Sequence, residues 1–225
     1  MKKILSAILI VATLILSCVT LSSCSDESID AGSYCTYRDT RSLEGKELSF
    51  VKMTVKGCGT MIILIDHTAA PATAENFMNL VNEGFYNGIT FHRIIRDFVV
   101  QGGDPTGTGR GGSDKTIYGE FATNGYYAND ITHLRGAIAM ARSGNPNSAS
   151  SQFYFCHADA TSLDTNYATF GYIIAGLNVV DKIVNKTVKY ADSNSGTIAD
   201  KSRQTVITVA VEISAEEASA YLPKK

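Results

Sequence analysis

The stretch FHRIIRDFVVQGGD, residues 91–104, decides the fold of this 225-residue chain. It holds two short apolar runs, Phe91–Ile95 and Phe98–Val100, and a pair of glycines follows the second run. Runs of this length, rich in β-branched and aromatic residues and bounded by turn residues, are typical of β-strands. The stretch therefore predicts two strands, with Arg93 and Gln101 as polar residues within or directly after them.

The same pattern continues on both sides of this stretch. Phe50–Val55 and Met61–Ile65 flank a Gly-rich turn, as expected of a hairpin. Further strand-like runs occupy Ala137–Ala141, Phe153–Cys156, Thr169–Ala175 and Val206–Ile213. Two segments, Pro71–Glu83 and Asn178–Val184, have apolar residues at helical spacing instead. Many short strands with two helices predict a mainly β domain whose antiparallel sheet closes into a barrel.

Composition agrees with one folded domain. Hydrophobic residues make up 44% of the chain, and the formal net charge is −2. This apolar content is high enough to offset the entropy of ordering the chain, which argues against bulk disorder. A chain without a basic excess lacks the electrostatic signature of nucleic-acid binding. We therefore expect a domain of about 165 residues that folds on its own, and no nucleic-acid partner.

The amino-terminal segment has the pattern of a bacterial export signal. Two lysines precede the uncharged run Ile4–Leu16, and the tetrapeptide Leu21–Cys24 (LSSC) follows. This tetrapeptide resembles the lipobox of bacterial lipoproteins, in which the cysteine receives the lipid, so Cys24 is the predicted lipidation site. Two alternatives stay open: lipidation at Cys18, and an uncleaved membrane anchor, because Ile4–Leu21 holds 18 uncharged residues.

These features divide the chain into four predicted parts: a lipoprotein signal at 1–23, a flexible tether at 24–48, a folded domain at 49–214 and a C-terminal tail at 215–225. The tether is polar and without periodicity, which is typical of a linker. Removal of the signal takes away two lysines and no acidic residue, so the mature charge is 18 minus 22, or −4. The predicted location is the bacterial cell envelope, where the lipid holds the exported protein on a membrane.

No motif for a metal, a nucleophile or a dinucleotide is present. The four histidines lack the spacing of zinc ligands, and the serines between 143 and 151 lack the G-x-S-x-G elbow of hydrolases. Residues 107–112 fit G-x-G-x-x-G, but no strand precedes them and no apolar helix follows, so they are predicted to form a surface loop. Cys156 is predicted to be buried, whereas Cys35 and Cys58 could pair or stay reduced. We expect no cofactor and no metal.

Several short motifs follow one another along the predicted domain. They are FHR (91–93), FVVQGGDP (98–105), MAR (140–142), NPNS (145–148), SQFY (151–154) and LD (163–164). In this order and spacing, the chain closely resembles the cyclophilin family of peptidyl-prolyl cis–trans isomerases from about Phe50 to Ile213. The resemblance implies an eight-stranded antiparallel β-barrel capped by two α-helices, in agreement with the strand and helix pattern.

An enzyme of this kind must rotate an X-Pro bond over a barrier of about 18–20 kcal/mol, which partial double-bond character sets. No bond is made or broken, so neither a nucleophile nor a cofactor is required. A cation that hydrogen-bonds near the prolyl nitrogen as it pyramidalises withdraws the lone pair from resonance, and this contact is stronger in the twisted state. The resemblance implies that Arg93 is this cation and that Gln101 and Gln152 orient it and the peptide.

The resemblance also implies the remaining contacts with the peptide. An apolar socket for the proline ring is implied at Phe98, Val99, Tyr154 and Leu163. Ala141 and Arg142 match the stretch whose backbone pairs with an extended peptide, and Tyr167 lines the same site. The implied partners are proline-containing peptides and folding proteins, and the family is commonly monomeric.

Four positions depart from the usual family pattern, and one of them is Ser162, which replaces a Trp common in eukaryotic members. Tyr154 stands where the socket usually holds Phe, so its hydroxyl needs a partner or water if it is buried. Val99 shortens one wall where Met is frequent, and Tyr167 replaces a common His. Because Arg93 and the two glutamines are intact, we expect an active isomerase that assists the folding of cell-envelope proteins. The two tyrosines also motivate an alternative, a proline-motif binding module or chaperone with negligible turnover.

Overall fold

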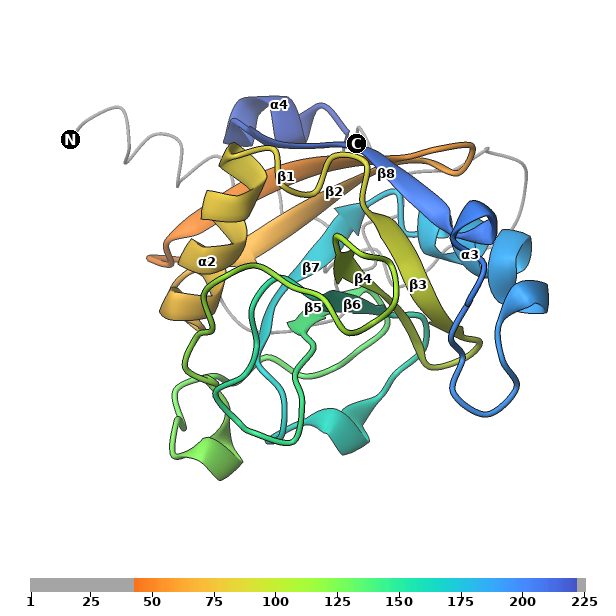
Figure 1. Cartoon of the computed structure of the whole chain (residues 1–225). Helices are drawn as coiled ribbons and strands as arrows, with labels where there is room; N and C mark the ends of the chain where they lie inside the picture. Colours follow the sequence, from red (N-terminus) through yellow and green to blue (C-terminus); the bar gives the residue numbers. More distant parts are fainter. Residues whose placement is uncertain (1–42, 222–225) are drawn as a thin grey trace, which may run out of the picture.

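Residues 43–221, which the computed structural model describes, contain eight strands that form a closed barrel (Figure 1). The strands are β1 (Leu48–Val55), β2 (Gly59–Asp66), β3 (Thr90–Ile95), β4 (Val99–Asp104), β5 (Ala137–Met140), β6 (Phe153–Cys156), β7 (Thr169–Ala175) and β8 (Thr205–Ile213). Around the barrel their order is β1-β2-β7-β5-β6-β4-β3-β8, and neighbouring strands are antiparallel. The predicted fold class is therefore confirmed.

Strand β4 continues beyond the apolar run Phe98–Val100 and passes through two glycines. Gly103 has a φ of +85°, and a Cβ atom there would lie 2.3 Å from the carbonyl oxygen of Ser151. A side chain at this position would therefore clash with the segment that leads into β6, and the backbone conformation favours glycine as well. Gly103 therefore lets β4 lie close to β6, which brings residues of both strands to the same surface.

Two helices lie on opposite sides of the barrel, α2 (Pro71–Asn82) and α3 (Asn178–Thr187) (Figure 1). Helix α2 buries the apolar face predicted from its spacing, with Phe77 fully buried. The Phe77 ring lies 5.1 Å from the ring of Tyr86, 5.6 Å from Phe153 and 5.1 Å from Phe170. Aromatic rings at these separations pack favourably, so α2 closes the barrel with a cluster of rings.

The packed part of the chain begins earlier than the predicted boundary at residue 49. Leu43 is 6% exposed and belongs to a core cluster with Phe50. Lys46 Nζ lies 2.9 Å from Asp66 Oδ2, which fixes the same segment to the end of β2. The boundary was predicted too late because one leucine in a polar run gives no periodicity. The predicted signal, Cys24 and residues 25–42 of the tether lie outside the described residues.

The predicted C-terminal tail contributes a short helix, α4 (Ala215–Ser219). The Ser214 hydroxyl accepts a hydrogen bond from the Glu217 amide and so caps the helix. Ala218 is buried in the same core cluster as Leu43. The start of the tail therefore packs on the barrel. Residues 222–225 lie outside the described residues.

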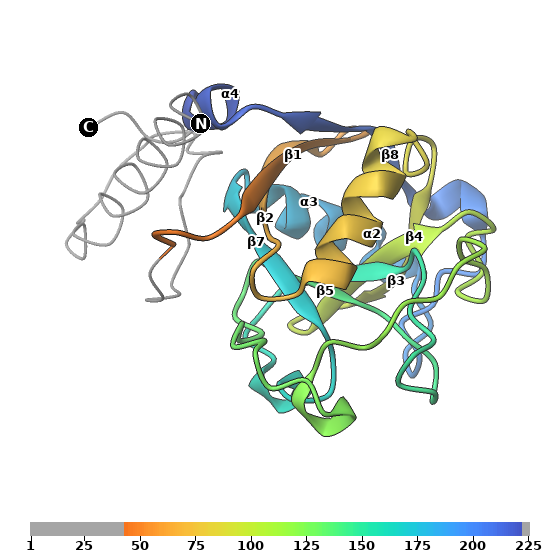
Figure 2. The same ribbon diagram turned by 90° about the vertical axis from the view of Figure 1, so that its left-hand side faces the viewer.

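Long loops leave the barrel between β4 and β5 and between β6 and β7, and Figure 2 shows them gathered at one end of the molecule. They include the 3-10 turns η1 (Ala122–Asn124) and η2 (Thr161–Leu163). Two more 3-10 turns, η3 (Val188–Tyr190) and η4 (Lys201–Arg203), lie between α3 and β8.

The glycine-rich segment 107–112 forms a loop, as predicted. The Asp104 carboxylate at the end of β4 accepts hydrogen bonds from the amides of Thr106, Thr108 and Gly109. Burial alone would raise the pKa of Asp104, but hydrogen bonds from the Thr106 hydroxyl and from the amides of Thr106, Gly111 and Gly109 lower it to about 2.

Two further findings apply to residues 43–221. No helix in this range is long and apolar enough to cross a membrane. The range also contains no group of three histidine, cysteine or acidic side chains that could hold a metal ion. Cys58 and Cys156 are buried free thiols.

Candidate active site

The structure brings nine of the ten predicted peptide-site residues together in one cavity of about 330 Å³. They are Arg93, Phe98, Val99, Gln101, Ala141, Arg142, Tyr154, Leu163 and Tyr167. The tenth, Gln152, is hydrogen-bonded to Gln101 at the edge of this cavity. We call the cavity the proline socket below.

Strand register places the central residues of the socket in one row. Arg93 on β3 is opposite Gln101 on β4, and Gln101 is opposite Tyr154 on β6. Residues directly opposite each other on antiparallel strands point to the same face of the sheet. Their neighbours Val100 and Phe155 belong to the core cluster inside the barrel, so this row lies on the outer surface. Three strands thus present a cation, an amide and an aromatic ring side by side.

Arg93 is held by two hydrogen bonds. Its Nε donates to the carbonyl oxygen of Ser195 at 2.8 Å, and its Nη1 donates to Gln101 Oε1 at 3.2 Å. The guanidinium carries five N–H donors, and those on Nη2 make no hydrogen bond with the described residues. Burial lowers the pKa of Arg93 from its ordinary value. The geometry therefore leaves a fixed cation with spare donors beside an apolar socket.

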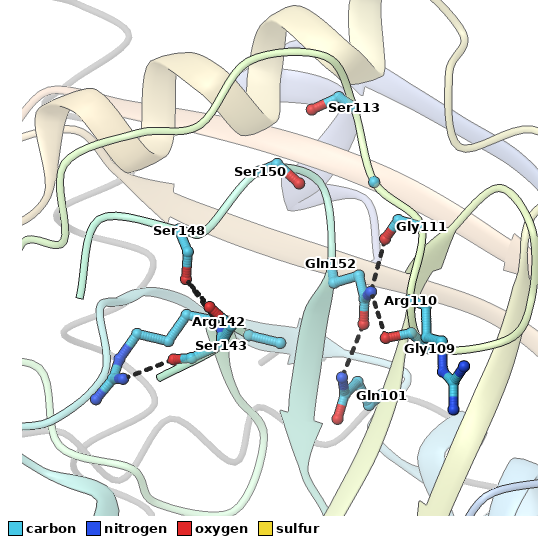
Figure 3. Close-up of a pocket in the computed structure, with 12 residues that line it drawn as sticks. Gln101, Gly109, Arg110, Gly111, Ser113, Arg142, Ser143, Ser148, Ser150 and Gln152 are labelled. Carbon is cyan, nitrogen blue, oxygen red and sulfur yellow. Dashed lines mark hydrogen bonds between the residues drawn. The ribbon is translucent and has the colours of Figure 1, made fainter. Parts of the chain in front are cut away.

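A chain of amides determines which way Gln101 points (Figure 3). Gln152 Nε2 donates to the carbonyl oxygens of Gly109 and Gly111, at 3.1 and 2.7 Å. Its Oε1 therefore faces the other way and accepts a hydrogen bond from Gln101 Nε2 at 2.9 Å. Gln101 Oε1 is then left to accept from Arg93. The glycine-rich loop thus orients Arg93 through two glutamines, by the rule that an amide donates only through its nitrogen.

The Tyr154 hydroxyl, whose partner the sequence left open, is paired with a buried histidine. Tyr154 is 4% exposed, and its hydroxyl lies 3.0 Å from His133 Nε2. His133 Nδ1 lies 2.7 Å from Asp164 Oδ1, and the carboxylate makes it the donor of that hydrogen bond. In neutral His133 the proton is then on Nδ1, so Nε2 accepts from the Tyr154 hydroxyl. The tyrosine ring can therefore line the socket without an unpaired hydroxyl.

This network predicts that Tyr154→Phe destabilises the protein by about 1 kcal/mol, because the variant leaves His133 Nε2 with one partner fewer. The loss stays at the low end of the usual range since Thr169 Oγ1 lies 3.1 Å from the same nitrogen. Urea unfolding of the two proteins measures the difference. Tyr167→Phe is the matched control, because the Tyr167 hydroxyl makes no hydrogen bond with the described residues, and equal losses in both variants would contradict the prediction.

Arg142 builds the outer wall of the socket. Its Nε and Nη2 donate to the carbonyl oxygen of Asn166 at 3.1 and 2.9 Å, and its Nη1 donates to Ser143. The guanidinium carbon lies 4.7 Å from the centre of the Tyr167 ring and 5.0 Å from that of Phe121. Cations at this distance from aromatic rings are attracted to them. Arg142 therefore fixes the position of the Tyr167 ring.

A second cavity of about 530 Å³ adjoins the socket (Figure 3). The two cavities share Gln101, Ala141 and Arg142. Its remaining walls come from the glycine-rich loop and from the serines that precede β6, and Figure 3 shows Arg110 and Arg142 on opposite sides. An extended peptide that places proline in the socket can therefore place a neighbouring side chain in this polar cavity.

Several residues of the site escaped the sequence analysis. Ser195 offers a backbone carbonyl, which any residue type can supply, so its identity gives no signal. His133 and Asp164 are 31 positions apart, and their pairing depends on how two loops pack. The glycine-rich loop was predicted correctly as a loop, but its carbonyls hold Gln152, which the pattern could not show.

The buried histidines predict that stability falls in acid. Burial lowers the pKa of His92 and of His133 below the unfolded value of about 6.5, and Asp164 offsets this only partly at His133. Both ring nitrogens of His92 lack a partner among the described residues. The unfolded chain therefore binds more protons below pH 6.5, so stability is greatest above that value and decreases as the pH falls toward the folded-state pKa values.

We expect the urea midpoint to be lower at pH 5.5 than at pH 7.5, with each histidine contributing up to about 1.4 kcal/mol per pH unit. His92→Phe removes one of these groups and should reduce the difference between the two pH values. A midpoint that rises on acidification would contradict the argument.

Comparisons with known proteins identify the family of the chain. Residues 50–210 match the model of the family described as cyclophilin type peptidyl-prolyl cis-trans isomerase/CLD. The chain belongs to the cyclophilin-type peptidyl-prolyl cis-trans isomerases. A cyclophilin catalyses cis–trans isomerisation of the X-Pro peptide bond, and the chain is accordingly an isomerase.

Individual relatives show how far the similarity extends. The chain is 43% identical to peptidyl-prolyl cis-trans isomerase ppi1 of Schizosaccharomyces pombe over 126 residues, which cover 56% of this chain and 79% of that protein. It is 42% identical to a peptidyl-prolyl cis-trans isomerase of Helicobacter pylori over 127 residues, 56% of this chain and 74% of that one. A crystal structure of a cyclophilin from Cryptosporidium parvum in the presence of the dipeptide Ala-Pro covers 73% of this chain and 99% of its own, at 28% identity and a TM-score of 0.63.

Proposed function

We propose that this cyclophilin catalyses X-Pro isomerisation in proteins of the bacterial cell envelope, with Arg93 as its catalytic residue. The observation that carries the assignment of Arg93 is its fixed guanidinium, which keeps free donors beside an apolar socket. Gln101 and Gln152 act as positioning residues, because they reach the reacting bond through Arg93. Phe98, Val99, Tyr154 and Leu163 hold the proline ring.

The chemistry follows from this arrangement. In the planar amide the prolyl nitrogen lone pair is delocalised, and rotation localises it on nitrogen. A guanidinium donor placed at that nitrogen stabilises the twisted state more than either planar state, which lowers the barrier. Because Arg93 is already held by Ser195 and Gln101, little reorganisation is needed when the lone pair develops.

The experiment that tests this function follows cis–trans exchange in a short X-Pro peptide. The wild-type chain is expected to accelerate exchange above the uncatalysed rate, and Arg93→Ala is expected to lose most of that acceleration. The rival function, a proline-motif binding module, predicts saturable peptide binding by calorimetry without exchange between cis and trans signals in two-dimensional NMR. Binding with no exchange would therefore replace the isomerase proposal with the binding module.

The location of the protein is a separate proposal. The basic, apolar and LSSC segments of residues 2–24 support export and attachment of a lipid to Cys24. The anchored isomerase would then act on envelope proteins during their folding, since uncatalysed X-Pro isomerisation takes tens to hundreds of seconds.

We predict that Cys24→Ala abolishes metabolic labelling with a radioactive fatty acid and moves the protein out of the membrane fraction. Cys18→Ala is the matched control, and it should keep both the label and the membrane association. Labelling that persists in Cys24→Ala and disappears in Cys18→Ala would assign the lipid to Cys18. Membrane association without any label would indicate an uncleaved anchor.

A further inference from the structure

A third cavity, of about 390 Å³, lies on the α3 side of the barrel. Lys56 from the turn after β1, Lys186 from α3, Lys189 from η3 and Arg203 from η4 all line it. None of the described residues that line it is acidic, and none belongs to the proline socket. Four cations from four elements thus converge on one cavity in a chain whose net charge is −2.

Internal contacts neutralise little of this charge. Lys186 Nζ donates to the carbonyl oxygen of Lys56 at 3.1 Å, which uses one of its three donors. Lys189 Nζ and the Arg203 guanidinium carbon lie 5.1 and 5.0 Å from the centre of the Tyr190 ring, which also lines the cavity. Asp200 lies 3.6 Å from Arg203, but both side chains are more than half exposed, and such pairs are weak.

We propose that this cavity binds a phosphoryl group carried by an organic molecule. Such a group offers several acceptor oxygens and negative charge, which suits ammonium and guanidinium donors. The cavity is larger than inorganic phosphate requires, and the Tyr190 ring offers an apolar wall to the rest of the molecule. A soluble phosphomonoester and the headgroup of a phospholipid share this chemistry.

The test titrates the full-length chain with each source at low ionic strength. One arm uses glycerol 3-phosphate in a calorimeter, and the other measures sedimentation with vesicles of phosphatidylglycerol against vesicles of phosphatidylcholine. The double variant Lys186→Gln, Arg203→Gln is expected to weaken binding at least about 10-fold. Lys182→Gln is the matched control, because Lys182 is exposed on the same helix but does not line the cavity.

The two arms distinguish the sources. Saturable binding of glycerol 3-phosphate that the double variant loses supports a soluble ligand. Selective sedimentation with phosphatidylglycerol, lost in the same variant, supports a lipid headgroup. Absence of binding in both arms, or binding that the double variant leaves unchanged, would overturn the proposal.

Discussion

Arg93→Ala is expected to lower kcat/KM for X-Pro isomerisation by about 10²–10³-fold, the usual effect of removing one preorganised donor from a developing charge. The physical reason is specific to the twisted state. The nitrogen lone pair becomes an acceptor only when the amide leaves planarity, so the guanidinium contact contributes more to the transition state than to bound peptide. We therefore expect the loss mainly in kcat, with a smaller change in peptide affinity. Exchange NMR on a short X-Pro peptide measures both quantities.

Two control variants separate this role from general effects of charge. Arg93→Lys keeps a positive charge but loses the fork that lets one side chain bond Ser195, Gln101 and a substrate together, so its rate should fall between wild type and alanine. Arg96→Ala removes a cation three residues further along, whose Nη2 bonds Asn185 outside the socket. Its kcat/KM should stay close to wild type. Equal losses in Arg93→Ala and Arg96→Ala would show that charge alone matters, and would contradict a catalytic contact.

Phe77→Ala is expected to lower the free energy of unfolding by about 3–5 kcal/mol, the range found for aromatic residues deleted from protein cores. Phe77 is fully buried, and three other rings pack around it. Its removal leaves a cavity that the rigid barrel strands cannot close. Domains of this kind are typically stable by about 5–15 kcal/mol, so the change is a large part of the total. Urea unfolding at neutral pH measures it.

The same variant should keep its activity while it is folded, since no residue of α2 lines the proline socket. Phe85→Ala is the matched control: Phe85 is partly buried and packs on the cluster from its edge, so its loss should be clearly smaller. If the Phe85 variant lost as much stability as the Phe77 variant, the ring cluster would not be the source of the effect.

Strand positions were predictable where the chain alternates between apolar runs and turns. Phe153–Cys156 and Thr169–Ala175 form β6 and β7 as expected, because each run is buried and bounded by turn residues. The pattern ended β4 too early, at Val100, since glycine has low strand propensity. In the structure β4 continues to Asp104, and the close approach of Ser151 to this strand requires glycine at position 103. Similarly, Leu43 carried no periodic signal, and its burial depends on the barrel surface it meets.

The residues of the site could be predicted from the sequence, but the hydrogen bonds between them could not. Family resemblance pointed to Arg93, Gln101 and the socket residues, and the structure places nine of the ten in one cavity. The pairing of Tyr154 with His133 and Asp164 could not be foreseen, because hydrogen bonds between loops depend on three-dimensional packing. The four cations that line the third cavity are likewise spread over some 150 positions of the sequence, from Lys56 to Arg203.

By itself the sequence determined the class of the fold, the order of its strands along the chain and the residue types needed to twist a prolyl bond. It could do so because strand periodicity, turn residues and short motifs are local properties. The tertiary structure alone decided which strands are neighbours, how the glycine-rich loop orients Arg93 through two glutamines, and where a second set of cations converges. These features require groups far apart in sequence to meet, and barrel closure fixes those distances.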